Sequence, residues 1–315
     1  MRFFDLHCDT LYRALVEEQD LYENDFHVSI KRVKNFNPYI GCFAVWIPDD
    51  VRGKKAKKLF YTAAQKLHNQ EFLHSEHFKV CNSFEDIRNI TKNKKKDGKN
   101  GIILTVEGGA VLAGDLSRVK LLSDLGVKMM TLTWNGKCEL GDGVGVENSK
   151  GLTIFGRQVV QEMEKYGIIV DVSHASEKLF YDVNATAMRP FVATHSNSKT
   201  VCGNRRNLTD EQFKIIKERS GLVGITFCND FLIENANAGF DDILKHAEHF
   251  LSLGGEDTLS IGSDFDGADI PDQITGVESI EALYEYFLIK NYSETLVDKI
   301  FFSNAYRFMR KFMIP

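Results

Sequence analysis

Residues 168–196 read IIVDVSHASEKLFYDVNATAMRPFVATHS, and the pattern in this stretch recurs along the chain. Short apolar runs at Ile168–Ser173 and Phe191–Thr194 stand on either side of a longer segment of mixed polarity. Nearly continuous apolar runs are typical of strands buried on both faces, and the longer segment is typical of a helix packed against them. The stretch therefore predicts one strand–helix–strand unit of a parallel sheet.

The same alternation predicts six further strands, with helices such as Ala56–Leu73 and Asp210–Ser220 between them and a helical tail over Ile280–Phe312. No stretch rich in Pro, Gly or Ser is long enough to link two domains. We therefore predict the α/β class, as a single-domain (β/α)₈ barrel of the TIM type over residues 1–315, whose C-terminal helical tail begins at about residue 280. The further strands are expected at Phe3–Asp9, Ile40–Trp46, Gly101–Glu107, Val127–Thr133, Leu222–Phe227 and Leu259–Ser263.

Composition and charge narrow the class of function. Of the 315 residues, 43% are hydrophobic, and the net charge is −5 with nine histidines counted as neutral. A mildly acidic chain lacks the electrostatic character of a protein that binds nucleic acid or an anionic membrane. The most basic run, Thr91–Asn100, is expected to be a solvated loop. We therefore predict neither nucleic acid nor a membrane as a partner.

The cysteines and the first residues indicate a cellular compartment. The six cysteines are scattered without a C-x-x-C pair, which favours free thiols in a reducing environment over a zinc module. The opening residues, MRFFDLHCDT, contain no apolar stretch of signal-peptide length. The chain also lacks a run of roughly 18 apolar residues, the length that a membrane-spanning helix needs. The prediction is a cytoplasmic protein.

Metal-binding and acidic side chains gather where the predicted strands end. In a (β/α)₈ barrel the carboxyl ends of the strands form one rim, and the active site is built there. Residues that are far apart in the sequence are therefore expected to converge. The residues at these strand ends are His7, Asp9, Glu107, His174, His195 and Asp264.

These residue types suit a metal site. His7 and Asp9 are two apart on a strand, so both point to one face and can chelate one cation. Glu107 ends a buried strand, where a carboxylate is costly unless it is paired or bound to metal. We expect it to bridge two cations, with a salt bridge at the rim as the alternative. His174 and His195 offer neutral imidazoles, which suit zinc and can hold a second ion.

Two further motifs have chemistry beyond metal binding. Asp264, in GSDFDG (residues 262–267), follows the last strand directly and is the candidate general base. Arg205 and Arg206, in NRRNLTDEQ (residues 204–212), follow the sixth strand. A guanidinium fork near the rim can bind a substrate carboxylate through two hydrogen bonds, and a structural ion pair is the alternative.

The ordered set of motifs resembles the renal or membrane dipeptidase family (peptidase family M19) of the amidohydrolase superfamily. The resemblance extends from Asp5 to about Gly267. It implies a (β/α)₈ barrel, a binuclear zinc centre and the hydrolysis of dipeptides. The motifs that carry it are DLHCDT (5–10), TVEGG (105–109), DVSHAS (171–176), ATHSN (193–197), CGNRRNLTDEQ (202–212) and GSDFDG (262–267).

The resemblance implies a role for each metal ligand. Matched by position, His7, Asp9 and Glu107 hold the first Zn²⁺. Glu107 bridges to the second Zn²⁺, which His174 and His195 complete. The cofactors expected from the resemblance are therefore two zinc ions that share one carboxylate.

The resemblance also implies substrate contacts, and here the chain departs from the animal enzymes. Arg206 matches the residue that binds the substrate's C-terminal carboxylate, and Asp264 matches the acid–base aspartate, which also lies near the first metal. After strand four the animal enzymes have a histidine where this chain has Trp134, followed by Asn135 as a substitute hydrogen-bond donor. After strand seven they have a tyrosine where this chain has Cys228. These departures affect the substrate pocket rather than the metal site.

The expected function is zinc-dependent hydrolysis of dipeptides with a free C-terminal carboxylate, with tolerance for a D-residue at the C-terminal position. A different amidohydrolase reaction, such as deacylation of N-acyl amino acids, is the first alternative, and a catalytically silent binding barrel is the second. A homodimer is compatible with such a barrel.

Overall fold

The structure is a computed structural model that describes residues 1–92 and 98–313. Its centre is a parallel sheet in the order β6-β5-β4-β2-β1-β8-β7. Parallel bridges from Val192 to Asp171 and from Ala193 to Val223 join the two ends of this order, so residues 191–194 close the barrel. The predicted α/β barrel is confirmed. Its strands are β1 (Phe3–Cys8), β2 (Tyr39–Trp46), β4 (Asn100–Glu107), β5 (Met129–Thr131), β6 (Ile169–Asp171), β7 (Val223–Ile225) and β8 (Leu259–Ile261).

The segment Phe191–Thr194 lies between β6 and β7 as predicted, but it forms a single parallel bridge to each side rather than a regular strand. At the end of this segment the backbone closely approaches its neighbours. A Cβ atom at Gly224 would lie 1.9 Å from the Thr194 carbonyl oxygen, and one at Gly262 would lie 1.7 Å from it. The carbonyl of Thr194 therefore packs directly on two glycines, and this departure from the ladder also sets the position of the next residue, His195.

A short strand that the sequence analysis does not predict, β3 (Phe78–Val80), pairs with the first residues of β4. Because β5 pairs with the last residues of β4, β3 lies at the opposite end of that strand from the carboxyl rim. The basic run Thr91–Asn100 begins within helix α3 and ends at the start of β4. Its central residues, 93–97, lie outside the described residues, so the predicted loop is not tested there.

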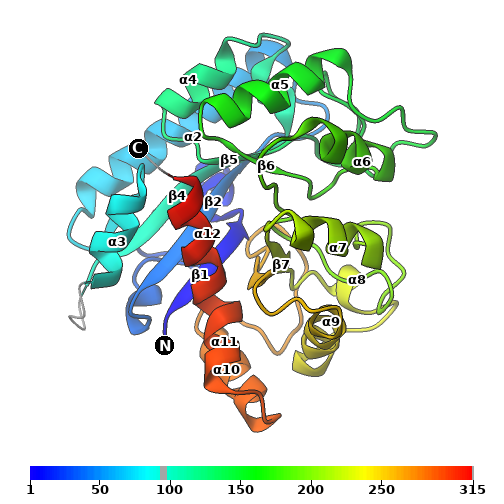
Figure 1. Cartoon of the computed structure of the whole chain (residues 1–315). Coiled ribbons are helices and arrows are strands. Elements are labelled where there is room, and N and C mark those ends of the chain that lie inside the picture. The colour runs from blue at the N-terminus through cyan, green and yellow to red at the C-terminus, as the bar shows by residue number, and fades with distance from the viewer. Residues whose placement is uncertain (93–97, 314–315) are drawn as a thin grey trace.

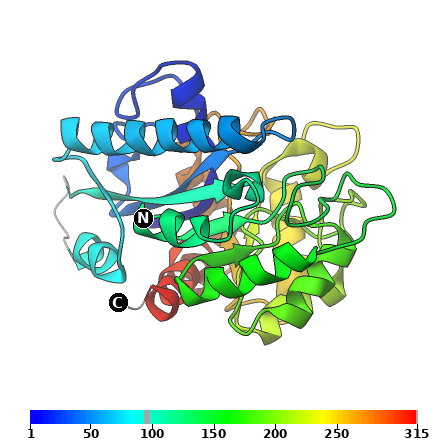
Figure 2. The same cartoon turned by 90° about the horizontal axis from the view of Figure 1, so that it is seen from above.

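Helices surround the strands, with α4, α5 and α6 on one side of the sheet and α7, α8 and α9 on another (Figure 1). Figure 2 shows the 21-residue α2 lying alongside the sheet. Within the described residues, no helix combines the length and the apolar character that crossing a membrane requires. The helices are α1 (Thr10–Val16), α2 (Gly53–Leu73), α3 (Phe84–Lys92), α4 (Arg118–Asp124), α5 (Ile154–Lys165), α6 (Glu177–Thr186), α7 (Asp210–Glu218), α8 (Asn229–Leu232), α9 (Phe240–Ser252), α10 (Ser279–Ile289), α11 (Glu294–Asp298) and α12 (Asn304–Phe312), with short 3₁₀ turns at Val33–Asn35 and Gly109–Leu112 and a π turn at Lys299–Ser303.

The end of the barrel opposite the rim is filled by apolar side chains. Phe4 on β1, Ile103 on β4 and Ile169 on β6 belong to one buried cluster together with Phe302 and Met309 of the C-terminal helices. Figure 1 shows α12 crossing beside β1, in agreement with the contacts between these elements. The apolar packing fixes the strands at one end and leaves their carboxyl ends free to carry polar side chains.

One buried histidine outside the rim predicts a pH-dependent stability. His246 on α9 accepts a hydrogen bond from the Ser198 backbone N–H and lies within hydrogen-bonding distance of the Leu232 carbonyl, each at 3.0 Å. Burial lowers its pKa to about 4, which outweighs the hydrogen bond to Leu232. Between pH 6.5 and 4 the unfolded chain binds a proton here that the folded chain does not, so this contribution to stability is lost as the pH falls.

We expect His246→Gln to remove this pH dependence. The difference in free energy of unfolding between the wild type and the variant, the gap below, should be about 2 kcal/mol smaller at pH 5 than at pH 7. Urea unfolding of both proteins at the two pH values, with equal metal loading, measures the gap. The same measurement on Asn69→Gln, at an exposed position of α2 that carries no titratable group, is the control and should give a gap that is independent of pH. An unchanged gap for His246→Gln would contradict the prediction.

Candidate metal centre

His7 and Asp9 lie together at the carboxyl end of β1. Between Asp5 and Cys8 the register against β2 shifts, because three steps along β1 match two along β2. An extra residue of this kind re-aims the side chains near it. His7 Nε2 is 3.2 Å from Asp9 Oδ2, whereas Cys8 Sγ contacts the Cys42 carbonyl at 3.7 Å. The structure thus places the H-x-D pair as the sequence predicts.

Glu107, the last residue of β4, lies between the histidines. Its Oε1 atom is 2.7 Å from His174 Nε2 and 3.5 Å from His195 Nε2. Its Oε2 atom is 3.9 Å from His7 Nε2. Each carboxylate oxygen therefore faces a different set of ligands, which is the arrangement that a bridging carboxylate requires.

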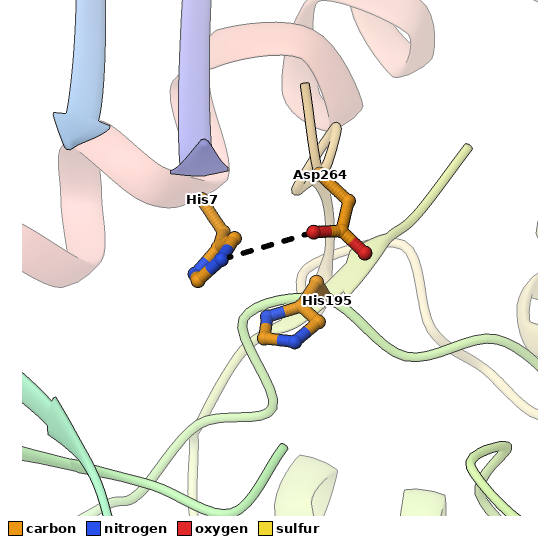
Figure 3. A group of neighbouring side chains, drawn as sticks. All are labelled: His7, His195 and Asp264. Atoms are coloured by element: carbon orange, nitrogen blue, oxygen red, sulfur yellow. Dashed lines mark ion pairs between the residues drawn. The ribbon is translucent and has the colours of Figure 1, made fainter. Parts of the chain in front are cut away.

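Asp264 approaches the same cluster from the loop after β8. Figure 3 shows Asp264, His7 and His195 coming from separate segments and pointing into one space, and Asp264 Oδ1 lies 3.9 Å from His7 Nε2. Within the described residues, the sets of ligand atoms that lie within 4.8 Å of one another are His7–Asp9–Glu107, Glu107–His174–His195 and His7–His195–Asp264. The first two sets contain the ligands that the sequence analysis assigns to the two ions.

The donor set fits divalent cations. Asp9 Oδ1 is buried without a hydrogen-bond partner among the described residues. His174 Nε2 and His195 Nε2 lie 2.9 Å apart, a distance at which two lone pairs repel unless a proton or a cation lies between them. Imidazole nitrogen and carboxylate oxygen are the ligands that zinc binds in catalytic sites. A polar cluster this deeply buried needs such compensation.

The two histidines beside Glu107 are held in their neutral form. Burial, together with the positive charges of Arg206 and His7, lowers the pKa of His174 well below its usual value. Burial and His7 do the same for His195, although the Glu107 carboxylate beside it acts in the opposite direction. A neutral imidazole keeps a lone pair for a metal, so both side chains are ready to act as ligands near neutral pH.

The pKa shifts of the buried carboxyl groups and of His7 reflect the concentration of negative charge in the site. Burial and the nearby Glu107 carboxylate raise the pKa of Asp9 to about 7, although His7 acts in the opposite direction. Burial and Glu107 also raise the pKa of Asp264. Burial opposes the charge on His7, but Asp9 and the other carboxylates raise its pKa to about 10. Like charges that raise one another's pKa are the groups that a cation stabilises most.

The backbone is strained at two of these residues. His174 has φ of +65° and Asp264 has φ of +64°, in the left-handed region that side chains other than glycine rarely adopt. Backbone hydrogen bonds hold both in place, from the Val144 N–H to the His174 carbonyl at 2.8 Å and from the Asp264 N–H to the His7 carbonyl at 3.1 Å. Strain of this kind clusters at functional sites, where the surrounding structure enforces it.

The cluster opens into a cleft of about 270 Å³. Trp134, Asn135 and Cys228, which the sequence analysis assigns to substrate binding, all line this cleft. Asn135 Oδ1 also lies 2.8 Å from His174 Nδ1 and so can orient that imidazole. Burial raises the pKa of the Cys228 thiol to about 12, which keeps it neutral.

An aromatic wall, formed by Tyr12, Trp46 and Trp134, makes up one side of the cleft. The centroids of Trp46 and Trp134 are 4.9 Å apart and those of Tyr12 and Trp46 are 5.1 Å apart, both pairs meeting edge to face. The sequence analysis misses Tyr12 and Trp46, and also Phe231, which lines the cleft as well. For Trp46 a signal exists, because it is the last residue of β2 and so lies at the same rim as Glu107.

Arg206 is buried next to the cluster. One guanidinium nitrogen donates to the His195 carbonyl at 3.3 Å, and the group lies over the Phe231 ring at 5.1 Å. Its Nε atom has no hydrogen-bond partner among the described residues. Burial lowers the pKa of Arg206, although Asp264 and Glu107 act in the opposite direction. Arg205 instead reaches the Val144 carbonyl at 3.2 Å from a more exposed position.

Comparison with known proteins agrees with this geometry. Residues 1–313 match the family described as membrane dipeptidase (peptidase family M19). A metallo peptidase from Rhodobacter sphaeroides, bound to a phosphinate mimic of the dipeptide L-Ala-D-Ala, is 29% identical and superimposes with a TM-score of 0.91 over 99% of both chains. Dipeptidase AC, a metallo peptidase of family M19, is 30% identical with a TM-score of 0.92 over 99% of both chains.

A curated human protein is also similar. Dipeptidase 3 is 27% identical over 242 residues, which make up 74% of this chain and 50% of the human protein. The match to the family spans almost the whole chain, and the ligand clusters lie at the rim of the barrel. The chain therefore belongs to the membrane dipeptidase family, peptidase family M19, and is a metal-dependent dipeptidase.

Proposed function

We propose that this protein is a zinc dipeptidase with two metal ions, acting on dipeptides that have a free C-terminal carboxylate. The observation that carries the proposal is the convergence of two ligand sets on Glu107 at the buried end of a cleft of about 270 Å³. A cleft of this size suits a small ligand of two residues rather than an extended peptide.

The residues divide into two ligand sets that share Glu107. His7 and Asp9 would hold the first ion with one oxygen of Glu107, and His174 and His195 would hold the second ion with the other. When bound, the cations supply a Lewis acid for the scissile carbonyl and lower the pKa of water. The neutral state of the two histidines beside Glu107 supports this assignment.

Asp264 is proposed to carry the proton. Its raised pKa brings it closer to neutral pH, where a carboxyl group can both accept a proton from water and donate one to the leaving amine. Its carboxylate lies beside His7 and lines the cleft, so it faces both the ligand cluster and the substrate. A general acid–base must reach both the water that it deprotonates and the leaving amine that it protonates.

The substrate contacts are proposed from the walls of the cleft. Arg206 is not among the residues that line this cleft, but it is buried beside the ligand cluster with an unpartnered Nε, and we propose that it binds the C-terminal carboxylate. Trp134 stands where the animal enzymes have a histidine, and its ring gives the cleft an apolar surface. We therefore expect Trp134 to contact the side chain of the substrate's N-terminal residue. Asn135 orients His174, and the neutral Cys228 thiol contributes apolar surface. Tolerance for a C-terminal D-residue is supported by the L-Ala-D-Ala mimic bound to the Rhodobacter sphaeroides relative.

The location is proposed to be cytoplasmic. Cys8, Cys42, Cys81, Cys138, Cys202 and Cys228 are all free thiols in the structure, as the sequence analysis predicts. Free cysteines in this number are typical of a reducing compartment.

The proposed function is tested by metal analysis combined with a substrate panel. We expect two zinc ions per chain, loss of activity on chelation and recovery with Zn²⁺. Of L,L-dipeptides, L,D-dipeptides, N-acyl amino acids and C-terminally amidated dipeptides, the first two should have the highest kcat/KM. A preference for N-acyl amino acids would replace this proposal with the deacylase, and inactivity of the zinc-loaded protein on the whole panel would favour a binding protein.

Arg206→Ala should lower kcat/KM only for substrates that have a free C-terminal carboxylate. A hydrogen bond between charged groups contributes about 3 kcal/mol, so we expect kcat/KM for dipeptides to fall roughly 10²-fold. Steady-state kinetics on a dipeptide and its C-terminal amide separate this effect from general damage. Arg205→Ala is the matched control and should retain dipeptide kinetics. Equal losses by Arg206→Ala on both substrates would contradict the role in carboxylate binding.

A further inference from the structure

Asp171, the last residue of β6, is fully buried and accepts hydrogen bonds from three neighbouring segments. Its Oδ2 atom accepts from Thr131 Oγ1 on β5 at 2.6 Å and from Thr194 Oγ1 at 2.7 Å. Its Oδ1 atom accepts from Ser173 Oγ at 2.9 Å and from the backbone N–H groups of Ser173 and Thr194, each at 3.0 Å. Both carboxylate oxygens are thus used, although Asp171 belongs to neither ligand set.

The contacts of Asp171 continue to a metal ligand. Thr194 Oγ1, which donates to Asp171, lies 2.9 Å from Nδ1 of His195. Ser173 Oγ, which also donates to Asp171, accepts from the His195 backbone N–H at 3.2 Å. Asp171 is therefore connected to both the ring and the backbone of His195. This is the segment where the regular ladder is lost, so these hydrogen bonds take over part of its role in fixing the chain.

We propose that Asp171 is a positioning residue that acts through the Thr194 hydroxyl to hold His195 with Nε2 free for the second metal ion. The inference rests on the proposed two-ion centre and adds to it the group that sets the affinity of one ion. Metal-binding histidines usually donate their second ring N–H to an outer partner, which fixes the tautomer and the orientation of the ring.

The direction of the hydrogen bonds follows from the chemistry of the three groups. An ionised carboxylate only accepts, so the Thr194 hydroxyl must donate to Asp171. The same hydroxyl then has a lone pair for His195, which it can offer only to an N–H at Nδ1. With the proton at Nδ1, Nε2 carries the lone pair and faces Glu107, 3.5 Å away. The negative charge of Asp171 thus selects the tautomer that can bind metal.

The two histidines of the second ligand set have different outer partners. His174 Nδ1 meets the amide oxygen of Asn135, which lines the cleft, at 2.8 Å. His195 is connected instead to a buried carboxylate through Thr194. Because the Asn135 contact does not involve Asp171 or Thr194, changes at Thr194 affect one ligand of the second ion and leave the other oriented.

Thr194→Val tests the proposal, because valine matches threonine in shape and removes only the hydroxyl. We expect the dissociation constant of the second zinc ion to rise roughly 10- to 100-fold, with the first ion unaffected. Thr131→Val is the matched control, since it removes a hydrogen bond to the same oxygen of Asp171 without touching an imidazole. Its second-ion affinity should stay within about threefold of the wild type. Thr194→Ser, which keeps the hydroxyl, should restore wild-type affinity.

The measurements are Zn²⁺ titration of the metal-free protein against a competing chelator and the visible spectrum of the Co²⁺-loaded protein. Asp171→Asn adds an independent outcome. An amide N–H that faces Thr194 would make the Thr194 hydroxyl accept instead of donate, so the hydroxyl would donate to Nδ1 of His195 and the ring proton would move to Nε2. The affinity for the second zinc ion should then fall, as in Thr194→Val. Equal affinities and equal cobalt spectra for Thr194→Val and Thr131→Val would overturn the inference, even if Asp171→Asn fails to fold. A wild type that binds a single ion would instead overturn the two-ion centre itself.

Discussion

Replacing Glu107 with glutamine is expected to abolish dipeptide hydrolysis and to leave fewer than two zinc ions on each chain. Both ligand sets contain this carboxylate, and its two oxygens face different histidines. Glutamine keeps the shape of the side chain but loses the negative charge and one acceptor. Because bound cations stabilise the transition state by several kcal/mol, the loss of one should lower kcat at least roughly 10³-fold.

The Glu107→Gln prediction is checked by elemental analysis of the dialysed protein and by kcat at saturating dipeptide. Glu218→Gln, at an exposed position on α7, is the control and should match the wild type in metal content and rate. Circular dichroism establishes that the variant is folded. A folded Glu107→Gln protein with two zinc ions and near-normal kcat would refute the bridging role.

Asp264→Asn is expected to give the second large effect, with a different signature. Asp264 lies 3.9 Å from His7 Nε2 and lines the cleft, so its carboxylate is placed between the ligand cluster and the substrate. Asparagine cannot exchange a proton, and the loss of a general acid–base typically lowers the rate by about 10²- to 10⁴-fold. Two zinc ions should remain, because the two proposed ligand sets are intact.

The Asp264→Asn measurement separates proton transfer from metal binding. Metal content, kcat and KM are determined together, and the expected pattern is a low kcat, a KM close to that of the wild type and full zinc occupancy. The pH profile of kcat should also lose the limb that the Asp264 carboxyl group causes. Loss of zinc together with activity, and recovery of both in excess Zn²⁺, would assign Asp264 to the metal rather than to the proton.

The barrel and the residues of the proposed metal centre can be predicted from the sequence because each is encoded locally. The apolar runs that lead to His7 and Glu107 mark both a strand and the side chain at its rim end, and a similar run leads to His195 although no regular strand forms there. The topology of a parallel barrel then places all strand ends together, whatever their distance in sequence. The capping box of α7 is a similar local signal: the Thr209 hydroxyl accepts the Gln212 backbone N–H, and the Gln212 side chain accepts that of Thr209.

The aromatic wall and the irregular strand depend on contacts between distant residues. Tyr12 follows Asp9 on a helix, and nothing in its neighbourhood indicates that it meets Trp46 in space. The segment Phe191–Thr194 has the composition of a strand, yet it forms only single bridges to its neighbours, and the Thr194 carbonyl packs against Gly224 and Gly262. Such close approaches depend on glycines in neighbouring strands, and the sequence of one strand does not show which residues of another strand it will meet.

The sequence alone therefore specified the residues of the proposed centre, since identity and strand position are properties of each residue and its neighbours. The tertiary structure alone specified what surrounds them. Asp171 looks like one more polar residue after an apolar run, and its connection to His195 exists only because three segments bring their hydroxyl groups to one buried carboxylate. Hydrogen bonds between separate strands depend on register and curvature, and these are set by packing of the whole barrel.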